Sequence, residues 1–284
     1  MTLNELYRYG KQTLRNNEIE DYTCDALMLM QNCFGVDRIQ LTIHGNETAD
    51  ADKETEYRQK IARRSEGYPL QYLIGTWNFM ERLFYVGEGV LVPREDTEVV
   101  VRAALKRMEG IKNPRVIDLC SGSGAIAVTL ALERPDAEIY ALELSETAFG
   151  YMQKNIAFHN ADNVKPLLGD VFTKHTDFAD HSFDVIVSNP PYICSGEIST
   201  LSREVLNEPH LALDGGIGGI DFYISIIKNW TAKIKPHGSL CFEFDPAQAK
   251  TIAEKMTAVG FGDIKIFKDF NEMDRAISGK MMLI

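Results

Sequence analysis

The stretch RVIDLCSGSGAIAVTLALE, residues 115–133, decides the fold class of this 284-residue chain. RVIDL is a short apolar, β-branched run that predicts a buried strand, and AIAVTLALE predicts a buried helix. Between them, Gly122 and Gly124 let the backbone turn tightly from the strand into the helix. The stretch therefore predicts one strand–loop–helix unit of an α/β fold.

The same alternation of strand and helix continues on both sides of this stretch. Further strands are expected at 138–144, 163–168, 183–188 and 238–244, and further helices at 96–108, 145–159, 221–234 and 246–260. The last two apolar runs, 263–270 and 275–279, have no helix between them and predict an antiparallel hairpin at the sheet edge. We therefore expect an α/β domain over residues 93–284, with a mostly parallel Rossmann-like sheet and helices on both faces.

The N-terminal part has a different pattern. Apolar residues recur at helical spacing over residues 1–74, which predicts a small helical domain. Residues 52–65 are mostly polar, so we expect an exposed helix whose basic residues face solvent. Aromatic and β-branched runs over 75–92 predict a linking β-hairpin. The helical domain carries no glycine-rich loop or acid–base group, and we expect it to recognise a substrate.

Composition narrows the function classes. The net charge of −11 and the pI near 5.1 argue against direct binding of nucleic acid, which usually needs a basic face. The five cysteines form no CxxC pair, so neither a disulfide framework nor a zinc site is expected. No run of about 18 apolar residues predicts a membrane span. The N-terminal sequence lacks the apolar core of a signal peptide, and a cytoplasmic protein is expected.

Two candidate cofactor sites follow predicted strands. In open α/β sheets, ligands bind beyond the carboxyl ends of the strands. Gly122, Gly124 and Ala127 fit a dinucleotide fingerprint, so the loop indicates a nucleoside-containing cofactor without saying which one. Asp118 precedes the loop and could orient it or meet an amino group of the ligand. Glu143 ends the next strand, where a carboxylate can accept hydrogen bonds from ribose hydroxyls.

The segment FDVIVSNPPYI, residues 183–193, predicts the chemistry. Proline fixes φ and has no N–H, so the Pro190 carbonyl can point into a pocket, with Pro191 holding Pro190 extended. The Asn189 side-chain oxygen adds a second acceptor, and two acceptors suit an NH₂ group. Tyr192 offers a flat face to stack on a planar group. The pattern predicts methylation of a planar amino or amide nitrogen by S-adenosylmethionine.

Several longer segments extend this pattern. DLCSGSGAIA with SNPPYI is similar to class I methyltransferases that act on exocyclic or amide nitrogen. GYPLQYLIGTWNF (67–79), VLVPREDTEVVV (90–101) and NEPHLALDGGIGGIDFY (207–223) resemble the peptide chain release factor N5-glutamine methyltransferases. The small helical domain also matches this family, and the resemblance covers essentially the whole chain.

The resemblance implies a substrate and a set of roles. The substrate would be the glutamine of the Gly-Gly-Gln motif in class I release factors, with Asn189, Pro190, Pro191 and Tyr192 at the glutamine amide. The cofactor, S-adenosylmethionine, would leave as S-adenosylhomocysteine. Its expected contacts are Asp118, Cys120, Ser121, Gly122, Ser123, Gly124, Glu143, Asp170, Val171 and Asn189, with Pro93 and Arg94 near the cofactor or the hinge. A monomer without a metal is expected.

The chain departs from the family pattern at three places. Cys120-Ser121 stands where the family usually has Gly-Thr or similar, and Glu143 stands where it often has Asp. Phe-Asp-Pro follows Glu243 where the family has a glycine-containing turn. The carboxylate survives at residue 143, so ribose binding is still expected.

Other functions remain open from the residues alone. An adenine-N6 or guanine-N2 methyltransferase acting on DNA or RNA would use the same Asn-Pro-Pro-Tyr chemistry, although the acidic charge argues against it. A nicotinamide-dependent oxidoreductase would use the same glycine loop, but no hydride-transfer group accompanies it. A catalytically silent binding protein would not need every motif position to be filled.

Overall fold

The computed structural model describes residues 1–282, which form two compact units. The helical unit comprises Met1–Thr76 together with Leu201–Glu208. The larger unit comprises the described residues from Trp77 to Thr200 and from Pro209 onward. The sequence boundaries 1–74, 75–92 and 93–284 place residues 201–208 in the larger domain, whereas the structure places them in the helical unit. Residues 283–284 of the predicted domain lie outside the described residues.

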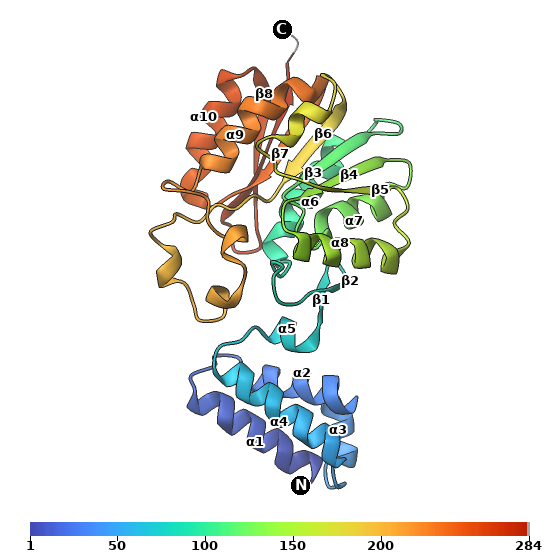
Figure 1. The fold of residues 1–284 in the computed structure, drawn as a ribbon, viewed down its shortest axis with the longest axis vertical. Coiled ribbons are helices and arrows are strands. Elements are labelled where there is room, and N and C mark those ends of the chain that lie inside the picture. The colour runs from blue at the N-terminus through green and yellow to red at the C-terminus, as the bar shows by residue number, and fades with distance from the viewer. Residues whose placement is uncertain (283–284) are drawn as a thin grey trace. The chain divides into compact units, whose positions relative to one another are not determined.

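The larger unit is built on a seven-stranded sheet (Figure 1) with the order β5-β4-β3-β6-β7-β9-β8. The strands are β3 (Arg115–Leu119), β4 (Glu138–Glu143), β5 (Val164–Leu168), β6 (Phe183–Ser188), β7 (Ile234–Glu243), β8 (Phe261–Lys268) and β9 (Asp274–Met281). The first five strands in this order run parallel, and β9 is antiparallel to both β7 and β8. The predicted mostly parallel sheet with an antiparallel edge hairpin is confirmed.

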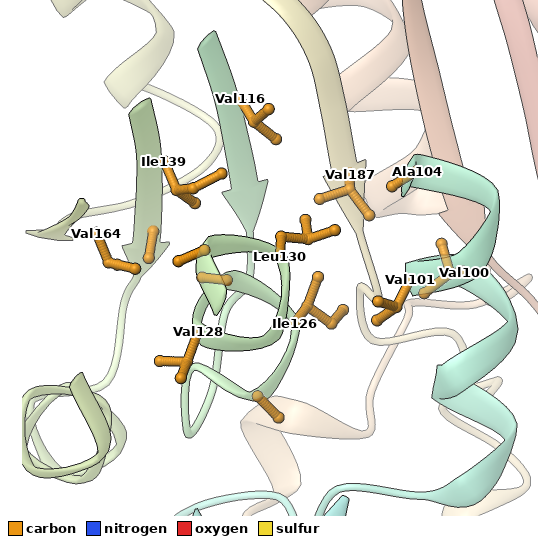
Figure 2. Packing of buried hydrophobic residues seen from close by; sticks show 14 of the residues in the cluster. Val100, Val101, Ala104, Val116, Ile126, Val128, Leu130, Ile139, Val164 and Val187 are labelled. Atoms are coloured by element: carbon orange, nitrogen blue, oxygen red, sulfur yellow. The ribbon is translucent and has the colours of Figure 1, made fainter. Parts of the chain in front are cut away.

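Helices cover both faces of this sheet. They are α6 (Glu98–Arg107), α7 (Ala125–Glu133), α8 (Glu146–His159), α9 (Asp221–Trp230) and α10 (Ala249–Ala258). Val116 and Val187 pack with Ile126 and Leu130 on the face of α6, α7 and α8 (Figure 2). Successive strand residues point to opposite faces, so Ile117 packs instead with the core of α9 and α10. Both faces are therefore apolar, as a sheet covered on both sides requires.

A short hairpin begins the larger unit. It consists of β1 (Thr76–Phe79) and β2 (Arg82–Tyr85), as the aromatic runs predicted. The next run, residues 89–93, forms no strand in the described chain. It contributes instead to the wall of the cavity described below.

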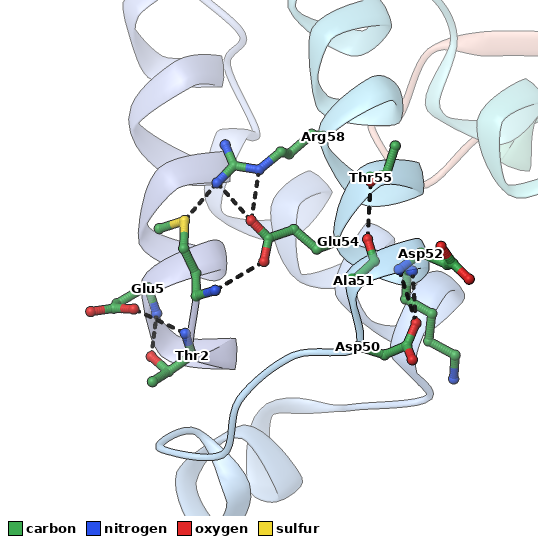
Figure 3. Close-up of polar contacts among 10 residues, drawn as sticks. Thr2, Glu5, Asp50, Ala51, Asp52, Glu54, Thr55 and Arg58 are labelled. Atoms are coloured by element: carbon green, nitrogen blue, oxygen red, sulfur yellow. Dashed lines mark hydrogen bonds and ion pairs between the residues drawn. The ribbon is translucent and has the colours of Figure 1, made fainter.

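The helical unit contains five helices, α1 (Leu3–Asn16), α2 (Tyr22–Phe34), α3 (Arg38–His44), α4 (Ala51–Ser65) and α5 (Leu70–Ile74). The side chain of Thr2 accepts from the Glu5 backbone N–H while Glu5 accepts from the Thr2 N–H, a capping box that starts α1 (Figure 3). Asp50 caps α4 by accepting from the N–H groups of Asp52 and Lys53 (Figure 3). Local sequence therefore fixes both helix starts.

Arg64 corrects the expectation that the basic residues of 52–65 all face solvent. Its side chain is buried, with Nε donating to Asp25 Oδ2 at 2.7 Å and Nη2 donating to Glu204 Oε2 at 2.9 Å. Its Nη1 also donates to the Tyr68 carbonyl at 3.2 Å. A buried charge needs such partners, and Glu204 comes from the segment Leu201–Glu208. This ion cluster ties that segment into the helical unit.

Candidate active site

A cavity of about 250 Å³ lies in the larger unit, with β3, β4 and β6 contributing the loops that follow their carboxyl ends. Among the residues predicted for the site, those that line it are Pro93, Arg94, Cys120, Ser121, Gly122, Ser123, Glu143, Asp170, Val171, Asn189 and Pro191. Asp118, Gly124, Pro190 and Tyr192 are absent from its lining. The topology therefore gathers loops from separate strands at one edge, as the rule for α/β sheets requires.

Two glycines of the loop adopt left-handed conformations. Gly122 has φ 55° and Gly124 has φ 79°. A Cβ on Gly124 would lie 2.9 Å from Met152 Cγ, so this glycine lets the loop approach α8 closely. A Cβ on Gly122 would meet no atom within 4 Å, since this residue faces the open cavity. Gly122 therefore leaves the cavity side of the loop free of a side chain, and Gly124 allows the loop to pack closely against α8.

Cys120 adopts a left-handed conformation without being glycine. Its φ is 61°, in the region that favours glycine. That conformation costs a non-glycine residue roughly 1–2 kcal/mol. The side chain is partly buried and packs against the core on the α9 and α10 face. The departure from the family pattern is therefore a position of backbone strain, offset by side-chain contacts.

Substitutions at Cys120 should separate these two effects. We expect Cys120→Gly to keep the unfolding free energy within about 1 kcal/mol of wild type, because relief of strain offsets lost packing and added chain entropy. Cys120→Val should lower it by roughly 1–3 kcal/mol, because a β-branched residue is strongly disfavoured at positive φ. Cys241→Val, in the ordinary backbone of β7, is the control. Denaturant unfolding measures all three, and equal tolerance of valine and glycine at residue 120 would contradict the strain argument.

Glu143 hydrogen-bonds to the glycine loop and to the start of α8. Its Oε2 accepts from the Gly122 N–H at 2.7 Å, and its Oε1 accepts from the Ser145 N–H at 2.7 Å. Burial raises the pKa of this carboxyl, and the hydrogen bonds from the two backbone N–H groups oppose that rise. Each carboxylate oxygen has a further lone pair, so the side chain can still accept from ribose hydroxyls. Glu143 therefore fits the predicted ribose contact and also shapes the loop.

Asp118 lies beneath the loop. Its side chain is fully buried, and in the described part of the chain neither carboxyl oxygen has a hydrogen-bond partner. Burial raises the pKa of Asp118 to about 8, because the charged form is poorly solvated there. Its backbone carbonyl accepts from Ser121 Oγ at 2.9 Å. Asp118 thus contacts the loop through its backbone, and its proposed contact with a ligand amino group stays a prediction.

Asn189 follows β6 directly and lines the cavity. Its Nδ2 donates to Thr97 Oγ1 at 3.1 Å. Because the amide nitrogen is engaged there, Oδ1 is the atom left to accept from a ligand. This orientation suits the predicted acceptor role toward an NH₂ group.

The other residues of the Asn-Pro-Pro-Tyr loop lie deeper. Pro190 and Pro191 are buried, and Pro191 alone of the two lines the cavity. Tyr192 packs against the core on the α9 and α10 face, and its carbonyl accepts from Gln248 Nε2 at 2.8 Å. Burial raises the pKa of the Tyr192 phenol, which stays neutral. Stacking of Tyr192 on a substrate stays a prediction.

Asp170 and Val171, which follow β5, also line the cavity. Asp170 Oδ1 accepts from the Phe172 N–H at 2.8 Å, and the Val171 carbonyl accepts from Trp230 Nε1 at 2.9 Å. These bonds fix the segment that was expected to flank the adenine. Phe222, which also lines the cavity, adds an apolar surface beside it. Flat apolar surface next to fixed polar groups is typical of a nucleoside site.

Sequence reasoning missed three residues that shape the site. Thr97 orients Asn189, and Glu243 lies buried at the end of β7. Asn155 accepts from the Tyr85 N–H at 2.7 Å and donates to the Ser123 carbonyl at 2.9 Å, which links the hairpin to the glycine loop. Thr97 and Asn155 contact residues 32–92 positions away in the chain, so no local spacing could have identified them.

The described residues contain no group of three or more His, Cys, Asp or Glu side chains placed to hold a metal ion. None of the helices in the described chain is long and apolar enough to span a bilayer.

Comparisons with known proteins agree with this geometry. Residues 5–75 match the PrmC N-terminal domain, and residues 96–216 match the methyltransferase small domain. The hMettl16 catalytic domain, solved in complex with the MAT2A 3'UTR hairpin 1, has a TM-score of 0.56 at 12% identity. That similarity covers 82% of this chain and 84% of that chain, and it shows the class I methyltransferase fold.

Proteins of similar sequence identify the branch of methyltransferases to which the chain belongs. The chain is 34% identical to the release factor glutamine methyltransferase of Geobacter sulfurreducens, over 99% of this chain and 97% of that protein. It is 37% identical to the release factor glutamine methyltransferase of Thermodesulfovibrio yellowstonii, over 94% of this chain and 93% of that protein. The methyltransferase domain indicates S-adenosylmethionine-dependent chemistry. With both parts matched over nearly its whole length, the chain belongs to the release factor glutamine methyltransferase family.

Proposed function

We propose that this protein transfers a methyl group from S-adenosylmethionine to the side-chain amide nitrogen, N5, of the glutamine in the Gly-Gly-Gln motif of class I release factors. The names of its relatives support this substrate. The observation that carries the proposal is the orientation of Asn189, whose Nδ2 is held by Thr97 and whose Oδ1 is left to accept. The protein would act in the cytoplasm, as a monomer without a metal, on a component of translation termination.

The cavity fits the cofactor by its donor set and shape. Glu143 supplies carboxylate oxygens for the ribose, and Gly122 leaves open space where a side chain would intrude. Asp170 and Val171 line the part of the cavity expected to hold the adenine. When bound, S-adenosylmethionine supplies a methyl group on a positively charged sulfur. The protein's task is then to hold the acceptor nitrogen in line with that methyl.

The amide nitrogen of glutamine is a weak nucleophile, because its lone pair is delocalised into the carbonyl. In the proposed mechanism, Asn189 Oδ1 in the cavity wall and the carbonyl of Pro190, which lies between the cavity-lining Asn189 and Pro191, each accept one N–H of the amide. These two bonds twist and localise the lone pair and aim it at the methyl group. The nitrogen becomes strongly acidic as it is methylated, so its proton can pass to water without a dedicated base.

The helical unit is proposed to recognise the folded release factor. It carries none of the residues that line the cavity. A single glutamine offers a small pocket little binding energy, so recognition of an intact protein needs further surface.

Removal of the helical unit should therefore weaken recognition of the release factor and leave binding of the cofactor unchanged. The variant lacks residues 1–74 and has a glycine–serine linker in place of 201–208, since that segment packs in the helical unit. We expect cofactor affinity near wild type, with kcat/KM for intact release factor at least about tenfold lower, the equivalent of about 1.4 kcal/mol. Calorimetry and a methylation assay measure the two. A folded variant that methylates release factor normally would refute the recognition role.

The nucleic-acid alternative can be tested beside the proposed function. The names of the relatives do not favour a DNA or RNA methyltransferase. We expect transfer of radiolabelled methyl from S-adenosylmethionine to a class I release factor, and background transfer to tRNA, rRNA and DNA at moderate salt. Labelling of a nucleic acid without labelling of the release factor would reverse this assignment.

A further inference from the structure

Glu243 lies behind the Asn-Pro-Pro-Tyr loop, outside the cavity lining. It ends β7, which pairs in parallel with β6, and Ser188 at the end of β6 pairs with Phe242. The next residues along the two strands are therefore Asn189 and Glu243. The Glu243 side chain is 1% exposed, and within the described chain its Oε2 has no hydrogen-bond partner. A carboxyl buried this deeply beside a reactive loop needs a physical explanation.

Thr97 connects this carboxyl to the site. Its Oγ1 accepts from Asn189 Nδ2 at 3.1 Å, and Thr97 is itself only 5% exposed. A hydroxyl that accepts from one neighbour still has one proton to donate. The Thr97 hydroxyl and the Asn189 amide both lower the pKa of Glu243 and so favour its charged form. The side chains of Glu243, Thr97 and Asn189 thus form one polar cluster that runs from the buried carboxyl to the cavity wall.

We propose that Glu243 is a positioning residue that acts through Thr97 on Asn189. In its ionised form Glu243 accepts a hydrogen bond from the Thr97 hydroxyl. This bond orients Thr97 so that its Oγ1 accepts from Asn189 Nδ2. Asn189 Oδ1 is then fixed toward the substrate amide. Successive hydrogen bonds polarise one another, so the negative carboxylate also strengthens Oδ1 as an acceptor. The inference deepens the proposed methyl transfer and rests on that function for its kinetic consequence.

Burial and the neighbouring groups together set the pKa of Glu243. Burial raises its pKa to about 7, and the Thr97 hydroxyl, Arg275 and the Asn189 amide each oppose that rise. Asp96 adds to the rise, and it shares Arg275 with Asp269, at 3.4 Å and 3.2 Å.

Two tyrosines complete the surroundings of Glu243. Tyr223 donates its hydroxyl to the Glu243 backbone carbonyl at 2.8 Å, and Tyr192 lies near enough to sense the carboxyl charge. Burial raises the pKa of both phenols, so they stay neutral while Glu243 titrates.

This environment gives the rate a defined pH dependence. Below the pKa, protonated Glu243 can donate its O–H to Thr97 Oγ1 and compete there with Asn189 Nδ2, so the orientation of Asn189 is released. The chemical step should therefore slow as pH falls through about 7 and reach a plateau above it. The dependence should appear in kcat and not in cofactor affinity, because Glu243 does not line the cavity.

The kinetic test compares single-turnover methylation of release factor between about pH 5.5 and 9. Wild type should lose roughly tenfold in rate across the acid limb. Glu243→Gln should be slower by roughly tenfold on the plateau and flat with pH, since a neutral amide cannot titrate. Thr97→Val should reproduce that loss, and Thr97→Ser, which keeps the hydroxyl, should restore the wild-type profile. Cofactor affinity by calorimetry should stay near wild type in Glu243→Gln, since Glu243 lies outside the cavity lining.

A second readout does not depend on activity. The Asn189 side-chain NH₂ resonances, followed by nitrogen-15 NMR of the full chain, should shift with a midpoint near pH 7 in wild type. They should show no such midpoint in Glu243→Gln. Wild-type rates and pH profile in Glu243→Gln, or an NH₂ shift that persists in it, would overturn the proposal. Absence of release factor methylation by wild type would instead overturn the proposed function, and the NMR titration would still decide the role of Glu243.

Discussion

Replacing Asn189 by alanine is expected to reduce single-turnover methylation of release factor by roughly 10²–10³-fold or more. The substitution removes the side-chain acceptor that Thr97 holds in place and leaves space for water in the cavity. One of the two N–H groups of the target amide would then lack its preorganised partner in the transition state. Cofactor affinity should change much less, because the glycine loop and Glu143 remain intact.

Three further variants provide reference values for this result. Asn189→Asp keeps an acceptor oxygen, and Thr97 can donate to its carboxylate, so it should lose less activity than Asn189→Ala. Tyr192→Phe should be mild and Tyr192→Ala severe, since Tyr192 packs its ring against the core and the phenylalanine keeps that packing. Circular dichroism and cofactor calorimetry confirm that each variant is folded. Near wild-type turnover by Asn189→Ala would reduce the loop to a proline-stiffened turn.

Replacing Glu143 by alanine is expected to have the largest effect on cofactor affinity. The variant loses the expected acceptors for ribose and also the bonds to the N–H groups of Gly122 and Ser145. Each lost hydrogen bond to a charged acceptor costs at most about 1.5–3 kcal/mol, roughly ten- to a hundredfold in affinity. Calorimetry with S-adenosylmethionine and with S-adenosylhomocysteine should show the weakening for both ligands.

Conservative variants separate the two roles of Glu143. Glu143→Asp keeps the carboxylate that the family often has there and should retain most of the affinity. Glu143→Gln places an NH₂ donor against a backbone N–H of Gly122 or Ser145, so it should resemble alanine. Unchanged affinity in Glu143→Ala, with the fold intact, would remove Glu143 from the cofactor site.

The fold was largely predictable because its signals are local. Alternating apolar runs marked the strands of the parallel sheet, and the parallel topology brings their carboxyl ends to one edge. Motif residues following different strands, such as Gly122, Glu143 and Asn189, were therefore expected to meet, and all three line one cavity. The position of β9 between β7 and β8 was harder to predict, since two neighbouring apolar runs in the sequence show only that a hairpin forms.

Contacts between distant residues could not be predicted in the same way. Arg64 lies in a polar helical stretch, which predicts a solvent-exposed side chain. It is instead buried and paired with Asp25 and Glu204, which are 39 and 140 residues away in the sequence. Thr97 and Glu243 acquire their roles only because α6, β6 and β7 pack together. The sequence likewise does not reveal that Asp118 faces the protein interior while its neighbour Cys120 lines the cavity.

Tandem mass spectrometry of a class I release factor tests the central claim most directly. The purified factor is incubated with the full chain and S-adenosylmethionine, then digested and sequenced, with Asn189→Ala run in parallel. The account predicts one added methyl group on the side-chain nitrogen of the Gly-Gly-Gln glutamine, and little or none with Asn189→Ala at the same time point. An unmodified glutamine after prolonged incubation with folded, cofactor-binding wild-type protein would contradict it.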